Sequence, residues 1–470
     1  MSLRPDDLFA TVAELASRLR ARTLSPVELA DAYLERIERV APKLSCFVTV
    51  TPERALEEAR EAEREIAAGR WRGPLHGIPY ALKDLVDTRG IRTTFGARPF
   101  ADRVPDRDAT VAVKLREAGA VLLGKVAMVE LAGGLGYHTA AASLTGACRT
   151  PWDPDRWAGG SSSGSGSAVA AGLAGFAIGS ETWGSITCPS AFCGVTGLRP
   201  TYGVVSRAGA MPLSWTLDKL GPMCRSAEDC SLVLAAIAGE DPADPTSVPP
   251  PARLGEIDLE SARGLRAAVL PFPEKPPVTS EVKALFGDAL AVLSGSGLVL
   301  EEAALPQFPY DELAMLFVEA EAASAFEPLI RSGRTRELAD PSHQQKTPAE
   351  YEPRASAADF VRAMRLRTEV QRSCAAFFER YDVVVAPNLP YPAPRVADPL
   401  DALFQSADPL GAAGNLAGLP AVALPMGFTT EEKVPVGFQV VGRPFDEARI
   451  LSVAAAFQAV TGHHRRTPPA

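Results

Sequence analysis

Short apolar runs alternate with helical segments in the first half of the chain, and this alternation limits the possible folds more than any other feature. The runs over residues 77–84, 120–125 and 176–180 are typical of buried strands, whereas residues 110–119 and 167–175 carry helical patterns. Strand, helix and strand at this spacing favour helices layered on a sheet. Strands that are apolar throughout are buried on both faces. The sequence therefore predicts an α/β fold with a sheet covered by helices on both faces.

The 470 residues are expected to form one large domain, 1–470, because hydrophobic residues make up 46% of the chain and can bury a large core. Residues of about 1–70 read as helices, one of them starting at Ser25 and Pro26. The core of the fold is expected over about 71–235. A polar, weakly patterned region over about 331–354 favours a mobile lid or a surface excursion.

Charge and hydropathy exclude several classes of protein. Lys and Arg total 48 against 57 for Asp and Glu, so the net charge of −9 creates no basic field for nucleic acid. The most apolar stretch, residues 168–179, is too short for a bilayer span of about 20 residues. The N-terminus lacks the apolar segment of a secretory signal, and the seven cysteines form no CxxC pair. We expect a cytoplasmic protein that uses no nucleic acid, membrane, metal or cofactor.

Residues 157–203 contain a dense run of glycine and serine, GGSSSGSGS, directly before an apolar helix and a strand. Such a loop lets the backbone approach a ligand closely. A flexible linker would not run straight into a buried helix, and a phosphate-binding loop would end in a lysine that is missing here. The loop alone is weak support for a site, so the neighbouring motifs decide its interpretation.

Three polar residues stand in motifs around this loop: Lys83 in PLHGIPYALKD, Ser161 in GGSSSG and Ser185 in SETWGSI. Their order and spacing resemble the amidase signature family of Ser-cisSer-Lys hydrolases. The resemblance continues through LRPTYGVVSRAG, NLAGLPAVALPMGF and PVGFQVVGRPFDEARIL, and it covers most of the chain. It implies the fold of that family, a large mixed central β-sheet covered by helices on both faces.

The resemblance also implies a role for each motif residue. Ser185 would be the nucleophile that forms an acyl-enzyme, and Lys83 would be the base, which requires a neutral amine. Ser161, following a cis peptide bond at Gly160, would relay the proton between them. The remaining implied groups are the backbone N–H groups of an oxyanion hole at Thr182, Trp183, Gly184 and Ser185, and a substrate-contacting backbone at Ala132 and Gly133.

Three residues depart from the family's usual Asp-Thr-Gly-Gly-Ser-Ile-Arg run. Glu181 replaces the acid, Trp183 the first of the two glycines, and Thr187 the arginine. A supporting acid–arginine pair is thereby lost or rebuilt, and the indole narrows or reshapes the pocket. We expect Arg199 to be a packing residue or a loop anchor.

Three functions are compatible with this sequence. The first is a hydrolase of amide-type C–N bonds in small molecules, including anilides, carbamates and esters, acting as a monomer or homodimer. The second is the A-type component of a tRNA-dependent amidotransferase, a glutaminase that works with a partner. The region around 344–360 lacks the arginine-led motif expected to hold the carboxylate of glutamine. The third is a non-catalytic binding protein on the same scaffold, which intact Lys83, Ser161 and Ser185 argue against.

Overall fold

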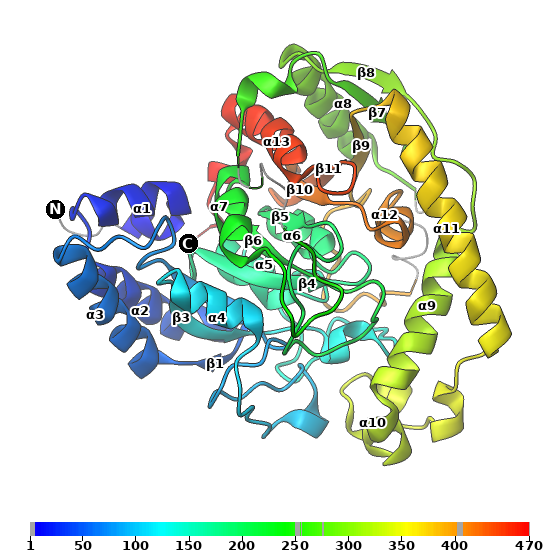
Figure 1. Cartoon of the computed structure of the whole chain (residues 1–470), viewed down its shortest axis with the longest axis horizontal. Coiled ribbons are helices and arrows are strands. Elements are labelled where there is room, and N and C mark those ends of the chain that lie inside the picture. Colours follow the sequence, from blue (N-terminus) through cyan, green and yellow to red (C-terminus); the bar gives the residue numbers. More distant parts are fainter. Residues whose placement is uncertain (1–4, 250–253, 255, 275–276, 402–407, 470) are drawn as a thin grey trace.

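A computed structural model describes residues 5–249, 254, 256–274, 277–401 and 408–469 of the chain (Figure 1). Within these residues eleven strands form one sheet, in the order β1-β3-β2-β4-β6-β5-β10-β11-β9-β7-β8. The strands are β1 (Phe47–Val50), β2 (Pro79–Lys83), β3 (Val121–Val126), β4 (Phe176–Glu181), β5 (Thr196–Arg199), β6 (Lys219–Cys224), β7 (Arg266–Val269), β8 (Val299–Glu302), β9 (Val383–Pro387), β10 (Ala421–Phe428) and β11 (Pro435–Val441).

The sheet is mixed, as the resemblance implies. Strand β2 pairs in parallel with β3 and β4, and β7 pairs in parallel with β8 and β9, whereas the other pairings are antiparallel. The parallel strands β2, β3 and β4 are buried at every position. This matches their continuous apolar sequence, because strands covered on both faces have no solvent side.

The helices are α1 (Val12–Arg20), α2 (Pro26–Leu44), α3 (Pro52–Ala67), α4 (Thr110–Glu117), α5 (Ser163–Ala170), α6 (Thr187–Cys193), α7 (Ala227–Ile237), α8 (Ser280–Gly295), α9 (Tyr310–Ala325), α10 (Glu327–Arg331), α11 (Ala357–Arg380), α12 (Gly411–Ala417) and α13 (Glu447–Thr461). They surround the sheet, with α1–α3 at one end of the molecule and α9 and α11 at the other (Figure 1). Among the described helices, none is both long and apolar enough to cross a bilayer.

Two neighbouring residues of β11 show that helices cover both faces of the sheet. Gly437 packs against Ala191 of α6, and the next residue, Phe438, packs edge-to-face on Phe457 of α13. Because successive side chains of a strand point to opposite faces, α6 and α13 lie on opposite sides of the sheet. The predicted fold class is therefore confirmed.

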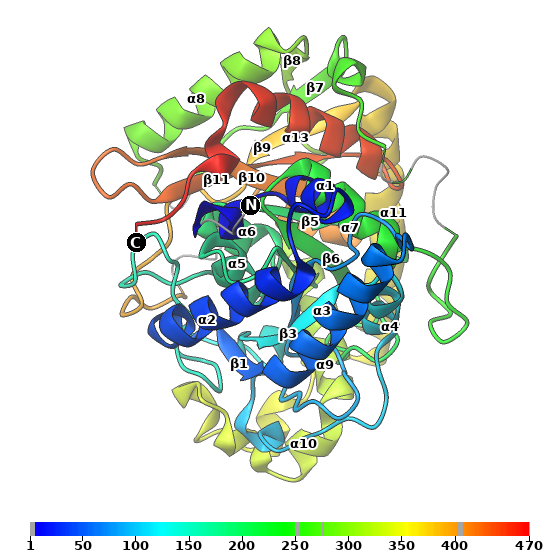
Figure 2. The same cartoon turned by 90° about the vertical axis from the view of Figure 1, so that its left-hand side faces the viewer.

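The N-terminal segment contains the expected helices and one strand that the sequence pattern does not predict. The side chain of Ser25 accepts hydrogen bonds from the N–H groups of Val27 and Glu28, and Pro26 is the first residue of α2. After α2 the chain enters β1, which pairs with β3 at the edge of the sheet (Figure 2). Strand β1 has only four residues, too few for a clear alternating pattern.

The polar region over 331–354 forms short 3-10 helices held against the loop at residues 130–139. His343 is buried, and its Nε2 donates to the carbonyl oxygen of Gly136 at 3.0 Å. The carboxylate of Glu130 accepts from the backbone N–H groups of Ala339 and Asp340, at 2.7 and 2.9 Å. The region is therefore anchored by buried polar contacts that a local sequence pattern does not reveal.

Candidate active site

Lys83 ends β2 and is completely buried. Its Nζ lies 2.7 Å from Oγ of Ser161, 2.8 Å from Oγ of Ser162 and 2.9 Å from Oγ of Ser180. Burial drives the pKa of Lys83 well below its ordinary value, against the opposing charges of Asp218 and Glu181. A neutral amine surrounded by hydroxyl groups can accept a proton, which is the property expected of a base.

Ser161 and Ser162 lie at the start of α5, directly after the loop rich in glycine and serine. The peptide bond between Gly160 and Ser161 is cis, as the resemblance implies. Ser162 bridges Lys83 to β4, since its Oγ donates to the carbonyl of Ser180 and accepts from the N–H of the same residue, both at 3.1 Å. Both serines therefore contact the amine of Lys83, and Ser162 also anchors it to the sheet.

Ser185 lies between β4 and α6, and only 7% of its surface is exposed. Its carbonyl oxygen accepts from the N–H of Ser162 at 3.2 Å, which ties the two serine segments together. Within the described part of the chain, no hydrogen bond joins the hydroxyl groups of Ser161 and Ser185. Among the described residues, the hydrogen bond between Lys83 and Ser161 is therefore formed, whereas one between the hydroxyl groups of Ser161 and Ser185 is not.

Glu181 forms an acid–arginine pair with Arg199, which takes the place of the arginine that Thr187 replaces. Oε1 of Glu181 accepts from Arg199 at 2.8 Å and from Asn415 at 3.0 Å, and all three residues are buried. Oε2 accepts from the N–H groups of Ile186 and Thr187, at 2.9 and 3.1 Å. Burial raises the pKa of Glu181, but Arg199 and Asn415 outweigh it and lower the value to about 2. The ionised carboxylate therefore fixes the backbone directly after Ser185.

The segment between Glu181 and Ser185 is shaped as an oxyanion hole requires. Gly184 has φ of 80°, in the left-handed region where a side chain would be strained. Within the described residues, the backbone N–H groups of Trp183, Gly184 and Ser185 have no hydrogen-bond acceptor, and these residues line a cavity. The backbone N–H of Thr182 also has no acceptor among these residues, and its hydroxyl donates to Oδ1 of Asp218 at 2.5 Å. Four consecutive N–H groups are thus available to an oxygen bound beside Ser185.

The cavity that Ser185 lines, called here the serine cavity, has a volume of about 480 Å³. Ala132 and Gly133 form part of its wall, in the position that the resemblance implies for substrate contact. Opposite walls come from α9 and from residues 346–354, so the polar region closes over the site. Trp183 also lines the cavity.

The charged residues of the serine cavity are mostly acidic. They are Asp311, Glu319, Lys346, Glu350, Glu352, Arg354 and Asp408. Burial raises the pKa of Asp408 to about 7, although its Oδ1 accepts from Leu410 and Gln439. Nowhere among the described residues do three or more His, Cys, Asp or Glu side chains form a group suited to a metal ion.

Four polar residues of the site were missed by sequence reasoning. Ser180 lies inside a strand, and Asp218 lies in the loop just before β6. Asn415 stands in the NLAGLP motif, to which no role could be assigned from the sequence. Asp408 stands in a part of the sequence without a motif or a periodic pattern. Position within the family motifs could have drawn attention to Ser180 and Asn415, but no local signal identifies Asp408.

Comparisons with known proteins show the family of the chain. A family profile described as Amidase matches residues 28–451. The A component of the glutamyl-tRNA(Gln) amidotransferase of Moorella thermoacetica is 40% identical over 489 residues, which cover 98% of each chain. The solved structure of the native peptide amidase from Stenotrophomonas maltophilia has a TM-score of 0.83 at 33% identity, covering 98% of each chain. The A component of the glutamyl-tRNA(Gln) amidotransferase from Thermotoga maritima has a TM-score of 0.80 at 29% identity, covering 100% of this chain and 99% of that one.

The matched profile spans most of the chain, and both solved structures share its fold over nearly their whole length. We conclude that the chain belongs to the amidase family, with the amidase signature fold, and is an enzyme that acts on amide C–N bonds.

Proposed function

We propose that the chain cleaves a linear amide through an acyl-enzyme on Ser185, with Lys83 as the base and Ser161 as the proton relay. The observation that carries this proposal is the buried contact of 2.7 Å between Nζ of Lys83 and Oγ of Ser161. A lysine buried beside hydroxyl groups, with its pKa lowered, can remove a proton at neutral pH.

The reaction would follow from these positions in two stages. Oγ of Ser185 turns toward Ser161, passes its proton through Ser161 to Lys83, and attacks the carbonyl carbon. The N–H groups of Trp183, Gly184 and Ser185 stabilise the negative oxygen of the tetrahedral intermediate. The C–N bond then breaks as Ser161 returns a proton to the nitrogen, and water releases the acid by the same route.

Covalent labelling tests the nucleophile. We expect a fluorophosphonate to modify Ser185, and we expect Ser185→Ala to remove both the labelling and the amidase activity. Ser163→Ala is the matched control, because Ser163 follows the relay segment and its Oγ donates to the carbonyl of Ala127 at 3.4 Å, away from Lys83. Full activity in a folded Ser185→Ala protein would exclude Ser185 as the nucleophile, whereas neither labelling nor activity in the natural sequence would favour the third function.

A second candidate is the A component of a glutamyl-tRNA amidotransferase. The curated relatives support it more strongly than the free-standing hydrolase placed first on sequence grounds, because they carry that name at up to 40% identity over nearly the full length. Asp408 offers a carboxyl group in the serine cavity that suits the ammonium group of a free amino acid. Under this candidate the chain acts on glutamine and passes ammonia within a complex with other proteins.

Ammonia release separates the two candidates. The purified chain is assayed with glutamine, with a peptide carboxamide and with an aryl amide, and a B-type partner protein is then added. Glutamine cleavage that rises at least tenfold with the partner supports the amidotransferase component. Efficient cleavage of the other amides by the chain alone, with no partner captured, supports the free-standing amidase.

A further inference from the structure

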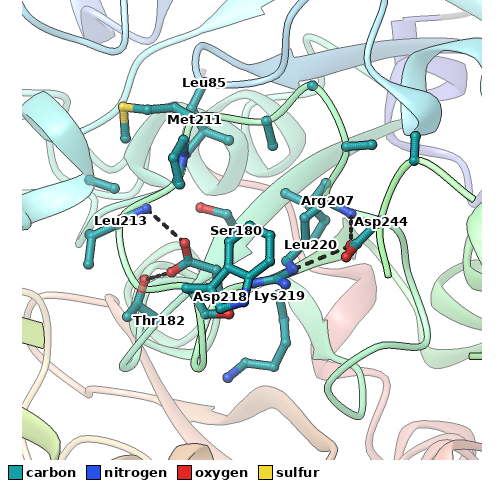
Figure 3. A pocket seen from close by; sticks show the side chains of 17 residues that line it. Leu85, Ser180, Thr182, Arg207, Met211, Leu213, Asp218, Lys219, Leu220 and Asp244 are labelled. Carbon is teal, nitrogen blue, oxygen red and sulfur yellow. Dashed lines mark hydrogen bonds and ion pairs between the residues drawn. The ribbon is translucent and has the colours of Figure 1, made fainter. Parts of the chain in front are cut away.

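A second cavity of about 190 Å³ lies beside the serine cavity and has no part in the chemistry described so far. We call it the side cavity. Leu85 and Met211 line one side of it, and Ser180, Thr182 and Asp218 line the other (Figure 3). Most of its lining is apolar.

The two cavities share a wall. Ala132, Thr182 and Leu213 line both of them. Ala132 of this wall and the preceding residue, Leu131, have φ of 55° and 51°, the left-handed region that non-glycine residues rarely adopt. Such conformations cost about 1–3 kcal/mol each and cluster where function requires a particular backbone shape. The wall between the cavities is therefore a strained segment next to the proposed site of attack.

The proton relay defines which half of a substrate faces the side cavity. The leaving nitrogen receives its proton from Ser161, which obtains it from Lys83 under the proposed mechanism. Ser180 lines the side cavity, and its Oγ is hydrogen-bonded to Nζ of Lys83 at 2.9 Å. The side cavity thus adjoins Ser180, a direct neighbour of Lys83, and we place the leaving amine there.

The lining of the side cavity suits an amine with an apolar substituent. Asp218 is partly exposed and receives hydrogen bonds from Thr182 and from the N–H groups of Leu213 and Ser214, which hold its carboxyl group in place (Figure 3). The guanidinium group of Arg207, which also lines the cavity, forms an ion pair with Asp244 at 3.5 Å and donates to Trp215, Tyr202 and Thr246 at 2.6, 3.0 and 2.6 Å. The fixed carboxyl group favours an amine over a carboxylate.

We propose that the side cavity binds the amine half of the substrate, and that the chain cleaves N-substituted amides carrying an alkyl or aryl group of about six heavy atoms. The size of this group follows from the volume of the side cavity, about 190 Å³, because an apolar cavity of about 150 Å³ in another protein binds benzene. This inference rests on the proposed chemistry at Ser185. In that chemistry the bond from Oγ of Ser185 to the acyl carbon forms, the C–N bond breaks, and the amine leaves with the serine proton. Water then yields the acid and restores Ser185.

Two amides that share an acyl group test this assignment with the purified full chain. The values of kcat/KM are measured for hexanamide and N-butylhexanamide in the natural sequence and in three variants. Ala210→Leu places a larger side chain in the lining of the side cavity, and Met211→Ala enlarges it. Ala67→Leu is the matched control, because Ala67 is exposed at the end of α3.

We expect N-butylhexanamide to be cleaved, and Ala210→Leu to lower its kcat/KM relative to that of hexanamide at least tenfold. Met211→Ala should shift the preference toward N-hexylhexanamide, and Ala67→Leu should leave the ratio unchanged. Cleavage of hexanamide alone, or an unchanged ratio in both cavity variants, overturns this inference and leaves the proposed function standing. Cleavage of neither amide together with no labelling of Ser185 overturns both.

Discussion

At the scale of single residues, the site depends on a lysine that is held uncharged by its surroundings. Lys83 is buried among hydroxyl groups, and the carboxylates of Glu181 and Asp218 act on it only from a distance through charge. Burial penalises the ammonium form, because no counter-ion among the residues that the structure describes touches it. The same burial makes Lys83 both the base of the proposed reaction and a group whose protonation differs between the folded and unfolded chain.

Replacing Lys83 tests both consequences. We expect Lys83→Ala to lower kcat/KM at neutral pH by at least about 100-fold, within the usual range for general acid–base groups. The pKa of Lys83 is lowered on folding, so the unfolded chain binds the extra proton and stability rises with pH between the folded and unfolded pKa values. Lys83→Met should remove that part of the slope in denaturant unfolding measured across pH. Lys283→Ala, on an exposed face of α8, should change neither quantity.

The buried pair of Glu181 and Arg199 makes the second prediction at this scale. We expect Glu181→Gln to lower the free energy of unfolding by about 3–5 kcal/mol, because it leaves Arg199 charged and unpaired in the core. The exposed pair of Glu260 and Arg263 is the control, and Glu260→Gln should cost no more than about 1 kcal/mol. The folded pKa of Glu181 is about 2, so its contribution is present above pH 4.5 and is lost as the pH falls toward 2. If Glu181→Gln and Glu260→Gln lowered the free energy of unfolding equally, the supporting role of the pair of Glu181 and Arg199 would be contradicted.

At the scale of elements, helix α5 must lie close to β3 for Ser161 and Ser162 to reach Lys83. A Cβ atom on Gly164 would come within 2.4 Å of the backbone N of Ala127 and 2.5 Å of the carbonyl of Cys46. Only glycine fits, because these neighbours are backbone atoms that cannot turn aside. The glycines between the serines of the GGSSSGSG motif therefore allow the helix to pack closely.

Two glycine substitutions in helices separate packing from helix propensity. We expect Gly164→Ala to destabilise the fold and to lower kcat/KM by displacing the start of α5. Gly287→Ala in α8 should raise stability by about 0.5–1 kcal/mol, because a Cβ atom there meets nothing and alanine favours the helix. Thermal unfolding and amidase assays on both proteins provide the measurement. A Gly164→Ala enzyme as stable and active as the natural sequence would contradict the packing argument.

At the scale of the whole molecule, one sheet connects strands from the first fifty residues to strands near the C-terminus. Strand β10 pairs with both β5 and β11, which joins segments more than 200 residues apart. The expectation of one domain over 1–470 remains a prediction, as do the state of monomer or homodimer and the cytoplasmic location.

Calorimetry tests the single-domain prediction directly. If the chain unfolds as one unit, a scan of the full-length protein shows one transition whose calorimetric enthalpy equals the van't Hoff enthalpy. Gel filtration before the scan establishes whether a dissociation step must be included. Two separated transitions from a monomer would show that the N-terminal and C-terminal parts of the sheet unfold independently.

The sequence by itself determined the fold class and the three residues of the proposed relay. Apolar runs and capping residues are local signals, and the motifs around Lys83, Ser161 and Ser185 keep a fixed order along the chain. Strand β1 was missed because four residues carry too little pattern. The sequence shows that Glu181 replaces the usual aspartate of the family, but it does not show which residue pairs with Glu181.

Only the tertiary structure decided that Arg199 and Asn415 complete the support of Glu181, that Asp218 holds Thr182, and that a second cavity lies beside the first. Asn415 is 234 residues from Glu181. Contacts over such separations depend on how whole strands and helices pack, and local periodicity carries no information about them. Cavities have the same origin, because their shape is the space left between elements after packing.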